Sequence, residues 1–434
     1  MALEDYKGDA MRCEMCSSCK FVPIFGRWGD IELSEVCPSI MRYNFYAYGL
    51  PGRLKALAAF LHGRIDFEDN SDSLLDLIYR CQMDGACDNA CKAAGRNMEP
   101  YEALLEWRIR CIEEGQVLPQ LMPVIEGLRS DDNMLQKPKA DRGKWAKGLK
   151  VKDLTKKNAE VCFWVGCRYS YDEELWPTLR KSIEILKEAE VDFGVFGKDE
   201  NCCGGRAYEM GFQGELIKYM ESNLEDWKTA GVKTVVTPCS DCYATFKAWY
   251  SRFGNKVEVY HLVEYLDKLI DEGKLKLKNK VPMTVTYHDP CHLGRLSEPY
   301  TYVAPGKPYT MPEKKVMGQL AWVYDVPKVW RMGARGIYEE PRNILKKIPG
   351  LRFNEMQRIK AYALCCGAGG GVIDTFPDYA HWTADNRLKE AAGTGAEALV
   401  TACGWCKRNF LDTLEETGDR MEVYDIIDIV QEAL

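Results

Sequence analysis

The cysteines define the chemistry that this sequence could perform. The chain has 19 of them among 434 residues, and all but Cys111 and Cys162 fall into a few short motifs. The two isolated cysteines are typical of buried structural thiols. Disulfide scaffolds are usually short chains from oxidising compartments, and no other feature indicates such an origin. The clustering therefore predicts that most of the thiols bind metal.

Two motifs beyond residue 159 each offer five thiols, arranged as a single cysteine, a Cys-Cys-Gly sequence and a Cys-x2-Cys pair. The first five-cysteine motif comprises Cys167, Cys202, Cys203, Cys239 and Cys242, and the second comprises Cys291, Cys365, Cys366, Cys403 and Cys406. Five thiols exceed the four ligands of a zinc ion or a cubane iron–sulfur cluster. Adjacent cysteines suit a cluster with separated irons and bridging thiolates. Zinc and plain buried thiols are the alternatives.

Glycines follow both Cys-Cys pairs, at Gly204, Gly205 and Gly367. Because glycine has no Cβ, these positions would let the backbone approach a bulky inorganic group closely. Their N–H groups could then point at its sulfurs.

A third pattern, residues 81–91, reads CQMDGACDNAC. With a cysteine at Asp84 it would be the C-x2-C-x2-C-x3-C run that binds a cubane cluster in bacterial ferredoxins. Asp84 is then either an oxygen ligand to iron or a turn residue beside a three-iron or water-ligated cluster. Both interpretations remain open, and a chance pattern is the third.

Composition excludes several other classes of protein. The chain is 46% hydrophobic and 28% charged, as expected for a soluble globular protein of several domains. No apolar stretch is long enough to span a membrane, and the first residues lack the features of a secretory signal, so we expect a cytoplasmic protein. A formal net charge of −7 argues against nucleic acid as a partner. The sequence has no Gly-rich nucleotide-binding fingerprint, so we expect no flavin on this chain.

Helical periodicity is clearest at residues 50–64 and 101–115, in the amino-terminal part. Short apolar runs that each end in a cysteine then predict strands at 161–167, 233–239, 283–291 and 397–403. Strands alternating with helical patterns indicate α/β units with largely parallel sheets, whose sites gather at the carboxyl ends of the strands.

The two α/β units are also related in sequence. VVTPCSDC followed by VEVYHLVEYL matches LVTACGWC followed by MEVYDIIDIV, with a constant offset of 164 residues. This repeat predicts a duplication and two pseudo-symmetric units.

With these motifs the chain resembles the family of heterodisulfide reductase catalytic subunits, which have paired cysteine-rich CCG domains. The resemblance implies a noncubane 4Fe-4S cluster on each five-cysteine motif. It also implies an all-α ferredoxin-like module with two cubane 4Fe-4S clusters at the amino terminus. The fold class expected is thus α followed by α/β: residues 1–125, a linker at 126–158, and CCG domains at 159–282 and 283–434.

Cubane ligands follow from the resemblance and from the crossed ligation of two-cluster ferredoxins, in which the last cysteine of each run binds the other cluster. The first cubane would take Cys13, Cys16, Cys19 and Cys91, and the second would take Cys37, Cys81, Cys87 and, in the remaining place, Asp84. The 17 residues between Cys19 and Cys37 depart from the usual spacing of three.

Two histidines, His288 and His292, flank Cys291 in YHDPCHLGR. They are the candidate catalytic residues, because they could supply protons or hydrogen bonds beside the second noncubane cluster. The alternative is that they are packing residues.

The second five-cysteine motif is interrupted by an insertion, residues 297–336, rich in Tyr, Trp and Pro. Aromatic residues in a long insertion suit a surface that docks a partner, or a lid over a site. An insertion that packs on its own domain is the alternative.

Two functions use the same residues. The first is electron transfer between cubane and noncubane clusters within a larger anaerobic complex, whose other redox subunits carry flavin or further iron–sulfur clusters. The second is cleavage of a disulfide, such as that of coenzyme M and coenzyme B, or action on a CoA-linked substrate, at the noncubane clusters. Segments 13–24 and 81–100 resemble most the subunits of acyl-CoA or benzoyl-CoA redox complexes.

Overall fold

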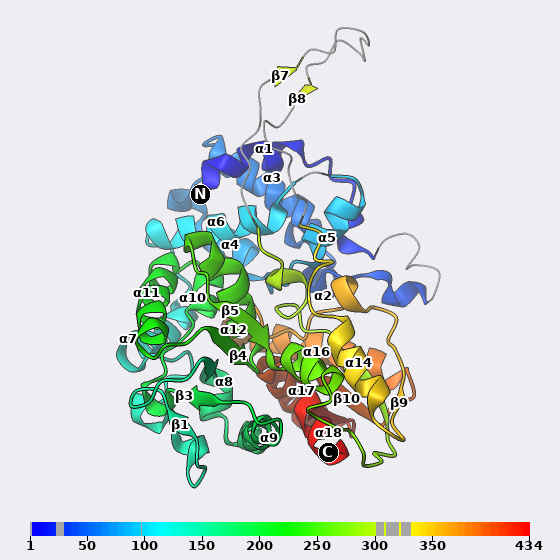
Figure 1. The fold of residues 1–434 in the computed structure, drawn as a ribbon. Helices are drawn as coiled ribbons and strands as arrows, with labels where there is room; N and C mark the ends of the chain where they lie inside the picture. Colours follow the sequence, from blue (N-terminus) through cyan, green and yellow to red (C-terminus); the bar gives the residue numbers. More distant parts are fainter. Residues whose placement is uncertain (1, 23–29, 97, 301–307, 310–320, 323–330) are drawn as a thin grey trace.

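The chain forms a helical region followed by two parallel β-sheets, each covered by helices (Figure 1). The computed structural model describes all residues except 1, 23–29, 97, 301–307, 310–320 and 323–330. The fold class expected from the sequence is therefore confirmed at the level of helices combined with parallel α/β units.

The amino-terminal region, up to residue 131, contains seven α-helices among its described residues. They are α1 (Lys7–Arg12), α2 (Pro38–Tyr43), α3 (Leu50–Leu61), α4 (Phe67–Tyr79), α5 (Ala86–Ala93), α6 (Pro100–Glu113) and α7 (Met122–Asp131). The expected helices at 50–64 and 101–115 correspond to α3 and α6. Nearly every side chain of α6 is buried, because this helix lies between the other helices and the α/β units. Among the described helices of the chain, none combines the length and apolar character that a bilayer crossing requires.

The first sheet has five parallel strands in the order β1-β3-β2-β4-β5. Its strands are β1 (Lys152–Asp153), β2 (Val161–Phe163), β3 (Phe193–Val195), β4 (Thr234–Thr237) and β5 (Glu258–His261). The helices of this unit are α8 (Cys167–Tyr171), α9 (Trp176–Glu188), α10 (Gly205–Glu209), α11 (Gln213–Thr229), α12 (Ser240–Ala244) and α13 (Leu262–Asp271).

The second sheet has four parallel strands in the order β11-β10-β6-β9. They are β6 (Thr284–His288), β9 (Arg352–Phe353), β10 (Ala398–Thr401) and β11 (Glu422–Asp425). The helices are α14 (Glu339–Lys347), α15 (Val372–Thr375), α16 (Pro377–Ala392), α17 (Gly404–Thr417) and α18 (Ile426–Ala433). This order matches β5-β4-β2-β3 of the first sheet, so the sequence repeat corresponds to a structural repeat.

Four buried strands deliver the cysteines to one edge of each sheet. β2, β4, β6 and β10 coincide with the four strands expected from the sequence, and each is followed within a few residues by a cysteine of a five-cysteine motif. Central parallel strands are buried on both faces, which explains their short apolar runs. The chain leaves the sheet where the strands end, so the thiols gather there.

The expected linker, residues 126–158, takes part in the fold. It contains the end of α7 and strand β1, which pairs with β3. This segment is rich in lysine, but its positive charge is not all solvated, because the side chain of Arg142 is fully buried.

Most of the insertion at 297–336 lies outside the described residues. Its strands β7 (Pro308–Tyr309) and β8 (Ala321–Trp322) form an antiparallel pair beyond the helical region, on the side away from the sheets (Figure 1). The two ends of the insertion are anchored on the helical region. Arg331 donates to Glu102 of α6 over 2.6 Å, and its guanidinium lies 5.1 Å from the ring of Tyr300.

Arg108 of α6 joins the three parts of the molecule. Its buried guanidinium donates to four backbone carbonyls, those of Ile78, Cys81, Glu209 and Gly370, over 2.7–3.1 Å. The first two belong to the helical region, Glu209 to the first α/β unit and Gly370 to the second. Each of these buried oxygens depends on Arg108 for this hydrogen bond.

We expect Arg108→Met to destabilise the protein by at least about 3 kcal/mol, since each buried carbonyl left without its donor costs about 1–3 kcal/mol. Anaerobic urea denaturation, followed by far-UV circular dichroism, measures this loss. Arg420→Met at an exposed position is the matched control. Equal midpoints for the two variants would show that Arg108 does not hold the parts together.

Candidate metal centres

In the first five-cysteine motif, the five thiols form one continuous chain of contacts. Hydrogen bonds between side chains connect Cys167 to Cys202, Cys202 to Cys203, Cys203 to Cys242, and Cys242 to Cys239. All five are free thiols and all are buried. Residues from three separate segments of the sequence thus meet in one place.

The second five-cysteine motif repeats this arrangement contact for contact. Cys291 is bonded to Cys365, Cys365 to Cys366, Cys366 to Cys406, and Cys406 to Cys403. All five are again free and buried. The two motifs adjoin each other, because Cys239 and Cys403 are close enough to interact electrostatically.

The thiols compete for protons inside each motif. Hydrogen bonds from Cys365 and Cys406 lower the pKa of Cys366 to about 6, and those from Cys202 and Cys242 lower the pKa of Cys203 well below its usual value. A buried cluster of thiols with partial thiolate character is the donor set that soft metals and iron–sulfur clusters select. The residues present therefore fit such a group.

Two of the predicted glycines direct backbone N–H groups at the sulfurs. Gly204 donates to Sγ of Cys202 and Gly367 to Sγ of Cys365, both over 3.3 Å. Gly367 also has a φ of +100°, and a Cβ there would lie 2.2 Å from the carbonyl oxygen of Ala380. A Cβ on Gly205 would lie 1.9 Å from Oγ1 of Thr245. Contacts with the protein itself therefore require glycine at both positions.

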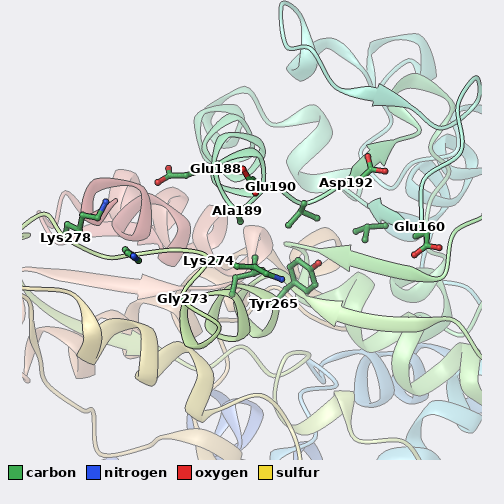
Figure 2. A pocket seen from close by; sticks show the side chains of 13 residues that line it. Glu160, Glu188, Ala189, Glu190, Asp192, Tyr265, Gly273, Lys274 and Lys278 are labelled. Carbon is green, nitrogen blue, oxygen red and sulfur yellow. The ribbon is translucent and has the colours of Figure 1, made fainter.

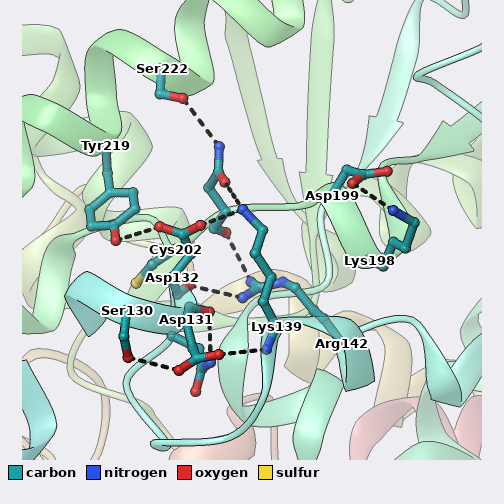
Figure 3. Close-up of polar contacts among 12 residues, drawn as sticks. Ser130, Asp131, Asp132, Lys139, Arg142, Lys198, Asp199, Cys202, Tyr219 and Ser222 are labelled. Atoms are coloured by element: carbon teal, nitrogen blue, oxygen red, sulfur yellow. Dashed lines mark hydrogen bonds and ion pairs between the residues drawn. The ribbon is translucent and has the colours of Figure 1, made fainter. Parts of the chain in front are cut away.

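Arg142 is a charged partner of the first motif that was not predicted from the sequence. Its guanidinium lies 3.7 Å from Sγ of Cys167 and donates to the carboxylate of Glu200 over 2.9 Å. The same side chain donates to the backbone of Asp132 and Asn201, within the polar network that Figure 3 shows. Arg142 lies in the Lys-rich segment 126–158, and no sequence pattern there distinguishes it from the solvated residues beside it.

His292 joins the second motif to the first α/β unit. Its Nδ1 lies 3.3 Å from Sγ of Cys291 and 3.4 Å from the carboxylate of Asp241, and its Nε2 lies 3.0 Å from Oε1 of Glu209. Burial alone would lower the pKa of His292, but Glu209 and Asp241 outweigh it and raise this pKa well above its usual value. Two carboxylates beside the imidazole favour its protonated form.

A small cavity lies beside these groups. It is bounded by Arg206 and Asp241 of the first unit and by His292, Trp405 and thiols of the second motif. The guanidinium of Arg206 lies 3.7 Å from the ring of Trp405 and donates to the carbonyl of Ala368 over 2.9 Å. These packed groups close the space over the second motif.

His288 is the last residue of β6. One of its ring nitrogens lies within 4.8 Å of Sγ of Cys366 and of Cys406. The ring packs edge-on against Phe410, with centroids 5.0 Å apart. Both predicted histidines therefore contact thiols of this motif or lie close to them.

In the helical region, the thiols form two adjoining groups. The first contains Cys13, Cys16, Cys19 and Cys91, which interact electrostatically and line one small cavity between α3, α5 and the loop after α1. Of the 19 cysteines, all of which are described, only Cys16 is exposed. Burial, reinforced by the neighbouring sulfurs, raises the pKa of Cys19 well above its usual value.

The second group contains Cys37, Cys81, Asp84 and Cys87, which also interact with one another. Asp84 is 7% exposed, and one carboxylate oxygen accepts from the N–H of Ala86 over 3.1 Å. The other oxygen, Oδ2, makes no hydrogen bond within the described structure and lies 3.4 Å from the guanidinium of Arg295. Burial raises the pKa of Asp84 despite this arginine.

A larger cavity of about 770 Å³ is distant from this chemistry. Its lining includes Glu160 and Asp192, which directly precede β2 and β3 (Figure 2). Tyr265 of α13 and Lys274, just after that helix, also line it. It therefore lies at the amino-terminal edge of the first sheet, whereas the thiols lie at the carboxyl edge. None of the described residues that line it is a cysteine.

The sequence of this chain is similar to one protein-family model and to several known proteins. The family model for the cysteine-rich domain CCG matches residues 161–247 and 331–411. Over 97% of its length the chain is 28% identical to one component of the dihydromethanophenazine:CoB–CoM heterodisulfide reductase of Methanosarcina mazei, covering 93% of that component. It is also 28% identical, over 64% of its length, to the EtfAB:quinone oxidoreductase of Syntrophomonas wolfei, covering 35% of that protein.

The fold is also similar to that of a solved structure. A hypothetical protein from Helicobacter pylori aligns over 88% of this chain and 68% of its own, with a TM-score of 0.55 and 11% identity. The first CCG match contains all five cysteines of the first motif, and the second contains four cysteines of the second motif, without Cys291. The chain therefore matches the cysteine-rich CCG domain twice, and over nearly its whole length it is similar to an oxidoreductase component of the heterodisulfide reductase type.

Proposed function

We propose that this chain carries electrons between four iron–sulfur centres within a multi-subunit redox complex. The observation that supports this most strongly is the order of the thiol groups. Cys19 of the first helical group interacts with Cys37 of the second. Asp84 of the second group interacts with Cys365 of the second five-cysteine motif, and Cys403 of that motif interacts with Cys239 of the first. The four sites are thus consecutive neighbours.

The ligand assignment follows these groups. In the ferredoxin-like region, Cys13, Cys16, Cys19 and Cys91 would hold one cubane 4Fe-4S cluster, and Cys37, Cys81, Asp84 and Cys87 would hold the other. Each five-cysteine motif would hold a noncubane cluster. When bound, such clusters accept and donate single electrons at potentials set by their surroundings. We propose domains at 1–125, 159–282 and 283–434, joined through 126–158.

The side chains around the centres define what the protein itself contributes. Arg142, Arg295 and His292 place positive charge beside Cys167, Asp84 and Cys291 respectively. Positive charge and N–H donors near sulfur stabilise the additional electron of a reduced centre. The buried surroundings of these groups exclude water.

Disulfide cleavage at the noncubane sites is the alternative function. It requires an open space of substrate size beside a five-cysteine motif, with a proton donor nearby. His292 is a suitable donor, but Arg206 and Trp405 close the cavity beside it within the described structure. This closure favours electron transfer, with the substrate and any flavin on other subunits. A relation to acyl-CoA or benzoyl-CoA complexes and a cytoplasmic location remain predictions from the sequence.

Iron analysis after anaerobic purification tests the proposal. Four 4Fe centres require about 16 iron atoms per chain. We expect Cys203→Ala and Cys366→Ala each to lose about four iron atoms, because each removes the central thiol of one motif. Cys162→Ala, at a fully buried thiol outside the motifs, is the control and should lose none. Fewer than about eight iron atoms in the unmodified chain, or stoichiometric zinc, would refute the assignment.

Asp84 provides a sharper test of the second helical group. Its Oδ2 has no hydrogen bond within the described structure, so we expect it to bind iron. Asp84→Cys should then keep the full iron content, whereas Asp84→Ala should lose about one iron atom. EPR-monitored redox titration should show the potential of one cubane changed and the other centres unaltered. Asp72→Ala, on the exposed side of α4, is the control. Unchanged iron and unchanged potentials in both Asp84 variants would exclude ligation.

A further inference from the structure

His288 is a buried polar neighbour of the second five-cysteine motif, and the groups around it determine which hydrogen bonds it can make. His288 is 1% exposed and stands at the end of β6, a central strand. Buried imidazole groups normally satisfy both ring nitrogens. In His288 only Nδ1 has a hydrogen-bond partner within the described structure, and Nε2 has none.

The partner of Nδ1 determines which tautomer the ring adopts. Nε of Arg387 lies 3.2 Å from Nδ1, and a guanidinium nitrogen can only donate. Nδ1 must therefore accept, and it carries no proton. An imidazole that accepts a hydrogen bond at Nδ1 is the neutral form. The one remaining proton is on Nε2.

Arg387 is itself fixed in place. It is fully buried in α16, and its Nη1 donates to Glu390 over 2.7 Å and to the carbonyl of Arg358 over 2.9 Å. Phe410 holds the imidazole from the side with its ring plane nearly perpendicular, at 88°. The ring can neither rotate freely nor exchange its acceptor for a donor.

Two sulfurs of the second five-cysteine motif lie close to the ring of His288. A ring nitrogen of His288, Sγ of Cys366 and Sγ of Cys406 all lie within 4.8 Å of one another. Since Arg387 occupies Nδ1, Nε2 is the nitrogen available to the sulfurs. An iron ligand would need an unprotonated nitrogen, which this tautomer does not offer at Nε2.

We propose that His288 is a permanent N–H donor to the thiolates of Cys366 and Cys406, held in that state by Arg387, and that it is neither an iron ligand nor a proton carrier. The inference rests on the proposed function, in which these thiolates bind a cluster. It revises the expectation that His288 is catalytic. Arg387 acts through His288 and is a positioning residue.

The first α/β unit offers an independent parallel. His288 stands three residues before Cys291, and Trp164 stands three residues before Cys167. Trp164 is buried, and its indole N–H also has no acceptor within the described structure. Indole nitrogen can only donate. Both units therefore place an obligate N–H donor at the same position, which is expected if the fixed tautomer of His288 matters.

The test uses the anaerobically purified full chain and EPR-monitored redox titration. Because N–H···S bonds stabilise the reduced state, His288→Phe should keep the iron content and lower the midpoint potential of the second noncubane centre alone. His288→Gln, which restores an N–H near the position of Nε2, should return the potential towards the unmodified value. Trp164→Phe is the matched control and should leave the second centre unchanged.

Two further measurements separate the role of each residue. Arg387→Met should shift the same potential in the same direction, and the double variant with His288→Phe should shift it no further than His288→Phe does. In pulsed EPR after exchange into D₂O, the deuterium coupling from Nε2 should be present in the unmodified chain and absent in His288→Phe. Additive shifts would overturn the positioning role of Arg387.

Loss of iron from the second centre in both His288 variants would show that His288 is a ligand. Full iron with unchanged potentials and unchanged deuterium coupling would show that it does not contact the centre. Either result overturns the inference while the iron–sulfur assignment stands. Absence of clusters from the unmodified chain would instead refute the proposed function itself.

Discussion

Burial of many thiols in contact with one another is the constraint on which the rest of this structure depends. A thiol cluster in a protein interior is poorly solvated, and negative charge on it costs free energy unless a cation or N–H donors compensate for it. The two parallel sheets collect the sulfurs at their carboxyl edges. The surrounding residues supply the compensation: Arg142 at the first five-cysteine motif, and His288 and His292 at the second. Metal would complete it.

The helical region connects to this arrangement through buried polar contacts. Arg108 binds carbonyls of all three parts, and Arg295 extends from the second α/β unit to the backbone of Asp84 over 2.8 Å. Gln82, within the ferredoxin-type run, donates to Thr383 of α16 over 2.7 Å. Such contacts have little tolerance for displacement, because each buried donor or acceptor that loses its partner is costly. The relative positions of the thiol groups are thereby fixed.

Much of this could be predicted from the sequence. The strands ending in cysteines follow from short apolar runs, and the pseudo-symmetry follows from the repeat at a constant offset. The charged partners could not be predicted. Arg142 and Glu200 lie 58 residues apart in the sequence. They pair because the fold packs the segment after α7, which contains Arg142, against the loop after β3, which contains Glu200. Glu209 is an ordinary helical residue until the fold brings it to His292. Long-range contacts between single charged residues leave no periodic signal in one sequence.

Cys16 differs from every other cysteine of this chain in being open to solvent. Its hydrogen bonds with the backbone and hydroxyl of Ser18 lower the pKa of its thiol, which increases its thiolate fraction. Thiolates exposed to solvent are the ones that peroxide and alkylating agents attack first. Damage in air would therefore begin at the amino-terminal group and leave the deeper sulfurs intact for longer. A partner protein that covered Cys16 would protect this chain against oxidation as well as exchange electrons with it.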